Sequence, residues 1–269
     1  MSFYWIYDVP NWLLGLLLVT IFAGGAAGGL LATRGPVRRL FGPPPGANDV
    51  VSYYLGAFGV FYGLTLGLIA VASWQNYADL DRLVADEAAV LRVLDRSAAW
   101  YPPSVRDALR GRLLDYAGFV IDEEWPAQRQ GRVLEAAQAR LTALEGPLVA
   151  FEPATAGQQA AHAETLRTYT HYLELRRERA FGAEATGLPA VVWYVLLAGA
   201  AASLALTFLF VLPDTRGHLL LTVVLAGFVG LLIFLIAAMD RPYRGEISVG
   251  PEAFEAVRQQ MRAGAAAAP

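Results

Sequence analysis

Four long stretches without a charged residue constrain the fold of this chain more than any other feature. They cover residues 9–33, 50–73, 185–213 and 219–239 of a 269-residue sequence. Each is about as long as the roughly 20 apolar residues that a helix needs to cross a bilayer. Only 17% of the residues are charged, whereas a typical soluble domain has about 25%. The pattern excludes an ordinary soluble enzyme and a disordered chain, and it predicts membrane-spanning helices.

The stretches divide the chain into two predicted transmembrane hairpins, a polar domain and a tail. The expected spans are about 11–32, 50–73, 189–212 and 218–239. The first hairpin then covers 1–73, the polar domain 74–188, the second hairpin 189–239 and the C-terminal tail 240–269. Aromatic residues before the first span suit the membrane–water interface; they are Tyr4, Trp5, Tyr7 and Trp12. An arginine-rich loop with a "GPPPG" bend is expected at 33–49, and the alanine-rich end of the tail is expected to be disordered.

Helical periodicity continues through the polar domain. No Gly or Pro lies between Leu68 and Tyr101, so the second span is expected to continue as one helix to about Trp100. Three further amphipathic helices are predicted, from Ser104 to Trp125, from 127 to 145, and from Thr155 toward the third span. Strand-period alternation is nearly absent, which predicts an all-α protein with a helical insert of about four helices between the second and third spans.

The second span combines a glycine groove with a partly aromatic face. Small residues recur at helical spacing and would let another helix approach closely; they are Gly56, Gly59, Gly63 and Gly67. The opposite face could line a pore, or it could pack inside the bundle; it carries Tyr54, Phe58, Phe61, Thr65, Leu68 and Ala72. No ionisable residue lies at mid-depth of a span. This argues against a proton pump and is compatible with a hydrophobic gate.

Glu87 interrupts an apolar stripe of the polar domain. A buried carboxylate needs a partner, and Arg92 lies too far round the helix to provide one. Glu87 is therefore either a charge switch paired with another helix or, more simply, a residue at the stripe edge that reaches water. The acidic run Asp122–Glu124 cannot supply the six to eight oxygens that calcium needs and is interpreted as a solvated helix end.

A basic cluster precedes the third span and consists of Arg176, Arg177 and Arg179. It could attract anionic lipid headgroups or concentrate anions near a pore, or it could be a solvated face paired with nearby glutamates. The histidines, His162, His171 and His218, show no metal-ligand spacing, and there is no cysteine. We expect no metal, no cofactor and no enzymatic activity. A net charge of −3 gives nucleic-acid binding no electrostatic basis.

Several segments together resemble a known family. They are "WLLGLLLV", "GLTLGLIAVASWQNY", "EEWP" at Glu123–Pro126, "LPAVVWYVLLAG" and "DRPYRGEISVGPEAF". The chain resembles the bestrophin-like bacterial membrane family, which is distantly similar to bestrophin ion channels. The last segment carries the most specific match, through Asp240, Arg241, Pro242, Gly245 and Pro251, with Tyr243 where a Phe is more usual.

The resemblance implies a homo-oligomeric ion channel of the bacterial inner membrane. Bestrophins are pentamers with four membrane helices per subunit and a helical cytosolic domain, and their second membrane helix lines the pore. The chain lacks the acidic calcium clasp of animal bestrophins. Asp240, Pro242, Gly245 and Glu87 are candidate structural or gating residues. The first interpretation is an anion channel with membrane lipids and small ions as partners. The alternative is a non-conducting scaffold or sensor whose helical domain binds a partner or ligand.

The arginine distribution gives a prediction of orientation. The loops after the first and third spans hold Arg34, Arg38, Arg39 and Arg216. The opposite side holds six arginines near span ends, namely Arg82, Arg176, Arg177, Arg179, Arg241 and Arg244. This balance favours a cytoplasmic helical domain.

Overall fold

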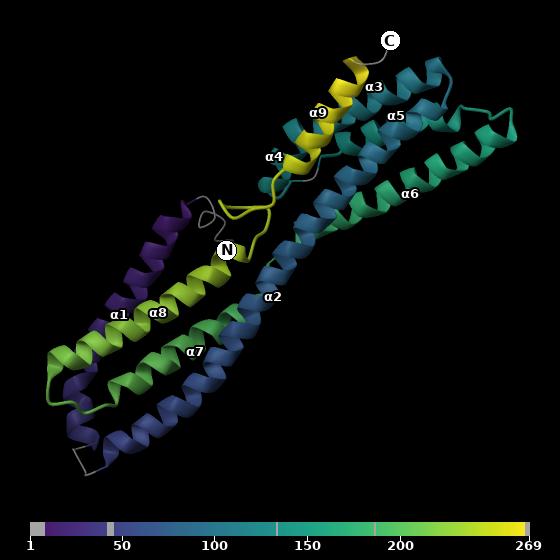
Figure 1. The fold of residues 1–269 in the computed structure, drawn as a ribbon. Helices are drawn as coiled ribbons and strands as arrows, with labels where there is room; N and C mark the ends of the chain where they lie inside the picture. The colour runs from purple at the N-terminus through teal and green to yellow at the C-terminus, as the bar shows by residue number, and fades with distance from the viewer. Residues whose placement is uncertain (1–8, 42–45, 133, 186, 267–269) are drawn as a thin grey trace. The chain divides into compact units, whose positions relative to one another are not determined.

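The computed structural model describes residues 9–41, 46–132, 134–185 and 187–266 (Figure 1). All regular structure in these ranges is helical. The helices are α1 (Asn11–Phe41), α2 (Ala47–Ser97), α3 (Pro103–Phe119), α4 (Trp125–Arg129), α5 (Ala136–Val149), α6 (Ala156–Ala185), α7 (Ala190–Phe208), α8 (Thr215–Met239) and α9 (Glu252–Ala266), with a 3₁₀ turn at Ala98–Trp100 and a π-helical turn, η3, at Val120–Glu124. The all-α prediction is confirmed. The predicted interfacial aromatics Tyr4, Trp5 and Tyr7 and the prolines of the predicted bend lie outside the described residues.

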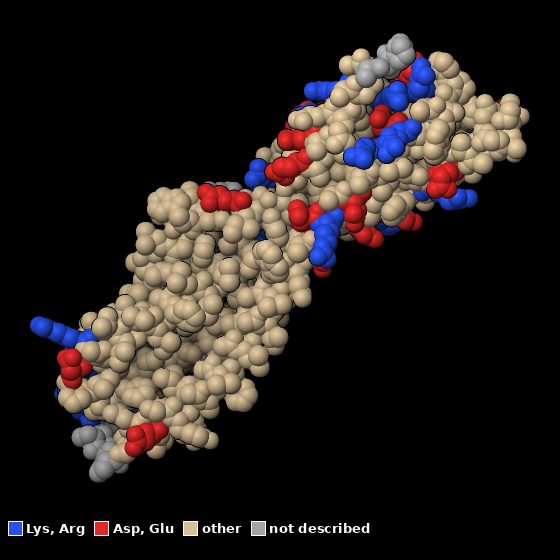
Figure 2. Space-filling model, in the orientation of Figure 1, with Lys and Arg blue, Asp and Glu red and all other residues tan. Residues whose placement is uncertain are grey.

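The chain forms two compact units. One comprises Met1–Asn76 and Gly187–Ile247, and we call it the membrane unit. The other comprises Tyr77–Thr186 and Ser248–Pro269, and we call it the polar unit. Within the described ranges, four helices are long and apolar enough to cross a membrane, namely α1, α2, α7 and α8. Helix α2 contributes its first part to the membrane unit and its second part to the polar unit. On the face shown in Figure 2, the membrane unit carries charged residues only at its ends, whereas acidic and basic residues are distributed over the polar unit.

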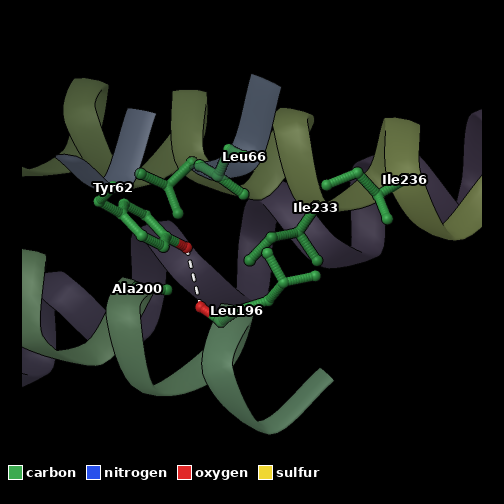
Figure 3. Packing of buried hydrophobic residues seen from close by; sticks show 7 residues of the cluster. Tyr62, Leu66, Leu196, Ala200, Ile233 and Ile236 are labelled. Carbon is green, nitrogen blue, oxygen red and sulfur yellow. Dashed lines mark hydrogen bonds between the residues drawn. The ribbon is translucent and has the colours of Figure 1, made fainter. Parts of the chain in front are cut away.

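Close helix packing builds the membrane unit. Helix α1 lies along α8 (Figure 1). Gly230 of α8 allows this approach, because a Cβ there would lie 3.2 Å from the Cα of Val19. A cluster of buried side chains joins α2, α7 and α8 (Figure 3); its members are Tyr62, Leu66, Leu196, Ala200, Val229, Ile233 and Ile236. Dense contact of this kind is how helices associate in lipid, where apolar burial alone gives little advantage.

Tyr62 fixes α2 against α7. Its hydroxyl donates a hydrogen bond of 2.8 Å to the backbone carbonyl of Leu196 (Figure 3). The ring fits because position 199 is a glycine; a Cβ at Gly199 would come within 2.3 Å of the Tyr62 ring. A tyrosine hydroxyl inside a membrane bundle needs a partner, and the Leu196 carbonyl supplies it.

The first predicted loop is wrong in its first half, because α1 continues through Pro36 to Phe41. Arg34, Arg38 and Arg39 therefore lie on a helix. Arg34 and Arg38 both donate hydrogen bonds to the carbonyl oxygen of Leu212, at 3.3 and 3.1 Å. These long-range contacts connect the last turns of α1 to the α7–α8 connection.

The helix predicted over residues 127–145 is also displaced. Gly131 has φ +70°, which ends the preceding helix because L-residues rarely adopt this conformation, and α5 begins only at Ala136. Helix α5 then passes through Pro147, which was expected to stop it. Pro147 has no N–H for the carbonyl of Ala143, and the Arg112 guanidinium donates to that carbonyl instead.

The tail is more ordered than expected. Helix α9 extends to Ala266 and therefore includes the first residues of the alanine-rich segment, consistent with the high helix propensity of alanine. Its buried residues Phe254, Val257 and Met261 form one face, and α9 packs against α3 within the polar unit.

Candidate functional site

The membrane part of α2 is the least covered of the candidate spans. All four glycines of the predicted groove are exposed, and a Cβ built on any of them would meet no atom within 4 Å. They are Gly56, Gly59, Gly63 and Gly67. Among the described residues of the chain, none fills this groove.

The predicted aromatic face is divided between the subunit core and the surface. Tyr54, Phe61, Leu68 and Ala72 are exposed. Phe58 and Thr65 are half-buried. Phe58 packs against the core cluster, with its ring stacked 6.1 Å from that of Tyr62. The Thr65 hydroxyl donates to the carbonyl of Phe61 at 2.9 Å. This face thus lies beside the face of α2 that packs against α7 and α8.

A third exposed face of α2 was not singled out from the sequence. Leu64 lies two residues from both Tyr62 and Leu66, which is roughly 200° around the helix from each. It is 61% exposed, and Val60 and Val71 beside it are exposed as well. This apolar face points directly away from the subunit core. Only the identity of the buried residues, which the sequence did not reveal, could have located it.

The segment after α8 is tied back to the start of α7. Asp240 is buried and accepts a hydrogen bond of 2.5 Å from the backbone N–H of Leu188. Gly187 and Gly245 have φ of +134° and +88°, so both turns need glycine, and Pro242 is buried. Of the predicted structural residues, Asp240, Pro242 and Gly245 therefore shape one junction.

Glu87 of α2 forms an ion pair with Arg179 of α6 inside the polar unit. Both side chains are 0% exposed. Arg179 Nε donates to Glu87 Oε2 at 2.5 Å and its Nη2 to Oε1 at 3.2 Å, and the hydroxyl of Tyr172 donates to the same Oε1 at 3.3 Å. The carboxylate is thus held on both oxygens, as a buried charge requires.

A second pair extends this network. Arg179 Nη2 also donates to Glu124 Oε2 at 3.2 Å, and Arg176 donates to Glu124 Oε1 at 2.5 Å. The remaining nitrogen of Arg179, Nη1, donates to the side-chain carbonyl of Gln128 at 2.7 Å. Two arginines balance two glutamates, so the buried group is electrically neutral.

Aromatic rings enclose Arg179. The guanidinium carbon lies 5.1 Å from the ring centre of Trp125 and 5.8 Å from that of Phe254 on α9, within the range of cation–π attraction. Trp125 Nε1 donates to the carbonyl of Val249 at 3.3 Å. The C-terminal segment therefore closes over the ion-pair network.

The network shifts the ionisation of its members. Burial alone lowers the pKa of Arg179, but the charges of Glu87 and Glu124 outweigh burial and raise the pKa well above its usual value. Burial raises the pKa of Tyr172 well above its usual value, and burial also raises that of Tyr116. Arg179 is thus charged and both tyrosines are neutral at physiological pH.

Three interpretations from the sequence change with this geometry. Glu87 is not a stripe-edge residue that reaches water, because its partner comes from α6. The acidic run is not fully solvated, because Glu124 is buried. The basic cluster is not a surface cluster: Arg179 is buried, Arg176 is half-buried and only Arg177 is exposed, with its guanidinium over the ring of Phe181. The sequence could not show that these side chains are buried, because their partners lie far away in the sequence.

Segments that carried the family resemblance meet at this network. Glu124 and Trp125 come from "EEWP", and Phe254 comes from "GPEAF". The model of the bestrophin-like domain matches residues 3–254. The chain belongs to the bestrophin-like family. Comparisons with curated proteins and with solved structures gave no match. As a bestrophin-like membrane protein it has four candidate spans, and the family match covers both the membrane unit and most of the polar unit.

Proposed function

We propose that this bestrophin-like protein assembles into a homo-oligomeric ion channel, selective for anions, with α2 lining the pore. The observation that carries the proposal is the uncovered surface of α2. Apolar side chains and glycines surround the helix on every side except the one that Tyr62 and Leu66 bury. A ring of subunits around a pore needs one helix of each copy to face the axis. The least covered span, α2, is the candidate for that position, and its glycines would allow close contact between copies.

The glycine and aromatic faces fit the contact between neighbouring copies. They flank the buried face of α2 on opposite sides, so the aromatic face of one copy can lie against the glycine groove of the next. Small residues allow the two helix backbones to approach, and aromatic rings fill the space above them. Each α2 then contacts its own subunit and two neighbours.

This arrangement leaves Leu64 and Val60 toward the pore axis. The sequence placed Phe61 and Thr65 on the candidate pore face, but Phe58 and Thr65 on that face are already half-buried. We therefore place the apolar constriction at Leu64, where a ring of side chains would resist wetting. The polar unit faces the cytoplasm in this proposal, and labelling of Ala89→Cys by an impermeant maleimide in intact cells would contradict that orientation.

Planar-bilayer recording of purified Leu64→Ala and Phe61→Ala variants tests the proposal. We expect Leu64→Ala to widen the constriction and raise the resting anion current, and Leu64→Trp to lower it. Phe61→Ala should mainly weaken the oligomer on size exclusion. A large current change with Phe61→Ala alone would return the pore to the face first predicted.

The alternative is a non-conducting scaffold or sensor. In that case wild type and all three variants carry no current at any voltage while the protein remains folded. This outcome would reject the channel, and it would shift attention to partners of the polar unit. No catalytic step forms part of either proposal.

A further inference from the structure

Two arginines at one end of the membrane unit converge on a single neutral oxygen. Arg34 Nη2 and Arg38 Nη2 both donate to the carbonyl of Leu212 in the α7–α8 connection, at 3.3 and 3.1 Å. Arg34 Nη2 also lies 3.5 Å from the carbonyl of Pro213. The two residues are four apart on α1, so their guanidinium groups emerge from the same face of the helix.

No described carboxylate compensates for these two charges. Neither arginine forms an ion pair within the part of the chain that the structure describes. Asp214 is nearby in sequence, but its two carboxylate oxygens accept from the backbone N–H groups of Arg216 and Gly217 at 3.0 and 2.9 Å and so cap α8. Arg34 Nη1 is buried and has no hydrogen-bond partner among the described residues. Two guanidinium groups whose charges no described carboxylate neutralises favour an anionic acceptor from outside the chain.

The position along α1 identifies the source of that acceptor. Asn11 and Arg39 bound the candidate span, and Arg34 lies 23 residues after Asn11. At 1.5 Å per residue this is about 35 Å, just beyond the roughly 30 Å of a hydrocarbon core. The two guanidinium groups therefore reach the level of the lipid phosphates. The surrounding segments, 33–49 and 209–217, hold four arginines against two aspartates.

We propose that Arg34 and Arg38 form a binding site for the phosphate of an anionic phospholipid headgroup. Each fork uses Nη2 to hold the α7–α8 connection and leaves other N–H groups free for the phosphate oxygens. The bound headgroup would pin that connection to α1. The site is distinct from the Arg176–Arg179 cluster suggested by the sequence, and it requires membrane insertion but not ion conduction.

Native mass spectrometry of the full-length protein in detergent, titrated with phosphatidylglycerol, tests the site. For Arg34→Gln combined with Arg38→Gln we expect the affinity for phosphatidylglycerol to fall roughly thirtyfold, since each arginine near a lipid surface raises the affinity about fivefold. Arg167→Gln is the matched control, because Arg167 is an exposed arginine of the polar unit, and it should leave the affinity unchanged. Phosphatidylcholine should bind wild type and double variant equally weakly.

Several results would overturn the proposal. One is an unchanged phosphatidylglycerol affinity in a folded double variant. Another is binding of millimolar inorganic phosphate, in the absence of lipid, to wild type but not to the double variant. This result would assign the site to a free anion. If the double variant does not fold, Arg38→Gln alone decides, because Arg38 is exposed; it should still weaken phosphatidylglycerol binding several-fold, and no weakening would reject the site.

Discussion

The two units of this protein handle charge and exposed surface in opposite ways. The polar unit buries Glu87, Glu124 and Arg179 and neutralises them, together with the half-buried Arg176, within one chain. The guanidinium of Arg179 lies against the rings of Trp125 and Phe254. The membrane unit instead leaves most of its part of α2 uncovered, with glycines, leucines and aromatics facing outward. The Tyr62 hydroxyl and the Asn48 side chain connect this helix to backbone groups of Leu196 and Val211. The difference teaches that the polar unit neutralises its buried charges with its own residues, whereas the described residues leave most of the apolar surface of α2 in the membrane unit without cover.

The neutrality of the buried network explains how such a group can be tolerated. A single buried charge would lose its hydration without compensation. Here every oxygen of Glu87 and Glu124 accepts from an arginine. The network also connects α2, η3 and α6, and Phe254 adds α9, so it fixes the relative positions of helices that are distant in sequence.

The largest effect is expected from Arg179→Met. It leaves Glu87 and Glu124 buried with only Arg176 to compensate, which should destabilise the polar unit by about 3–5 kcal/mol. The melting temperature in detergent should fall by roughly 10 °C. Arg177→Met is the control, because Arg177 is exposed, and it should change stability by less than about 0.5 kcal/mol. Equal shifts in the two variants would show that burial of the network contributes nothing special.

A smaller effect is expected from Gly199→Ala in the membrane unit. The new Cβ would lie within 2.3 Å of the Tyr62 ring, and overpacking of this kind costs about 1–3 kcal/mol. Gly63→Ala, where a Cβ meets nothing within 4 Å, should leave the subunit's melting temperature unchanged or slightly higher.

Gly63 then separates subunit stability from assembly. Gly63→Leu should dissociate the oligomer on size exclusion while Gly199→Ala should not. An intact oligomer with Gly63→Leu would remove the groove from the proposed interface.

The smallest effect concerns alkaline pH. Because burial raises the pKa of Tyr172 in the folded state, its stabilising contribution is complete below the unfolded pKa near 10 and is lost as pH rises above it. Tyr172→Phe should cost about 1 kcal/mol at pH 7 through the lost bond to Glu87, but it should lose less stability than wild type between pH 9 and 11. Thermal melts across this range, with the exposed Tyr194→Phe as control, measure the difference. Parallel pH profiles of Tyr172→Phe and wild type would contradict it.

Charge-free length determined the membrane architecture from sequence alone. A stretch of 20 or more apolar residues has few options besides a spanning helix, and the absence of Gly and Pro from 69 to 100 sufficed to predict the long continuation of α2. The glycine spacing of α2 was also recognisable, because spacing is a local property of one helix, and the structure shows these glycines exposed. Helix ends were harder to predict from the sequence. Helix α5 passes through Pro147, and the carbonyl that this proline leaves free accepts a hydrogen bond from Arg112, 35 residues away in sequence.

Tertiary structure decided where the charges go and which side of α2 is covered. Glu87 and Arg179 are separated by 92 residues, and neither carries a local sign that the other will neutralise it. A carboxylate at the edge of a stripe and one at its centre have the same sequence pattern, and only the partner distinguishes them. Similarly, the sequence predicts a loop at Arg34, whereas the structure places this residue on α1, with its side chain bonded to the carbonyl of Leu212. Periodicity records which residues share a face, but the neighbour that each face meets depends on packing between segments that the sequence keeps far apart.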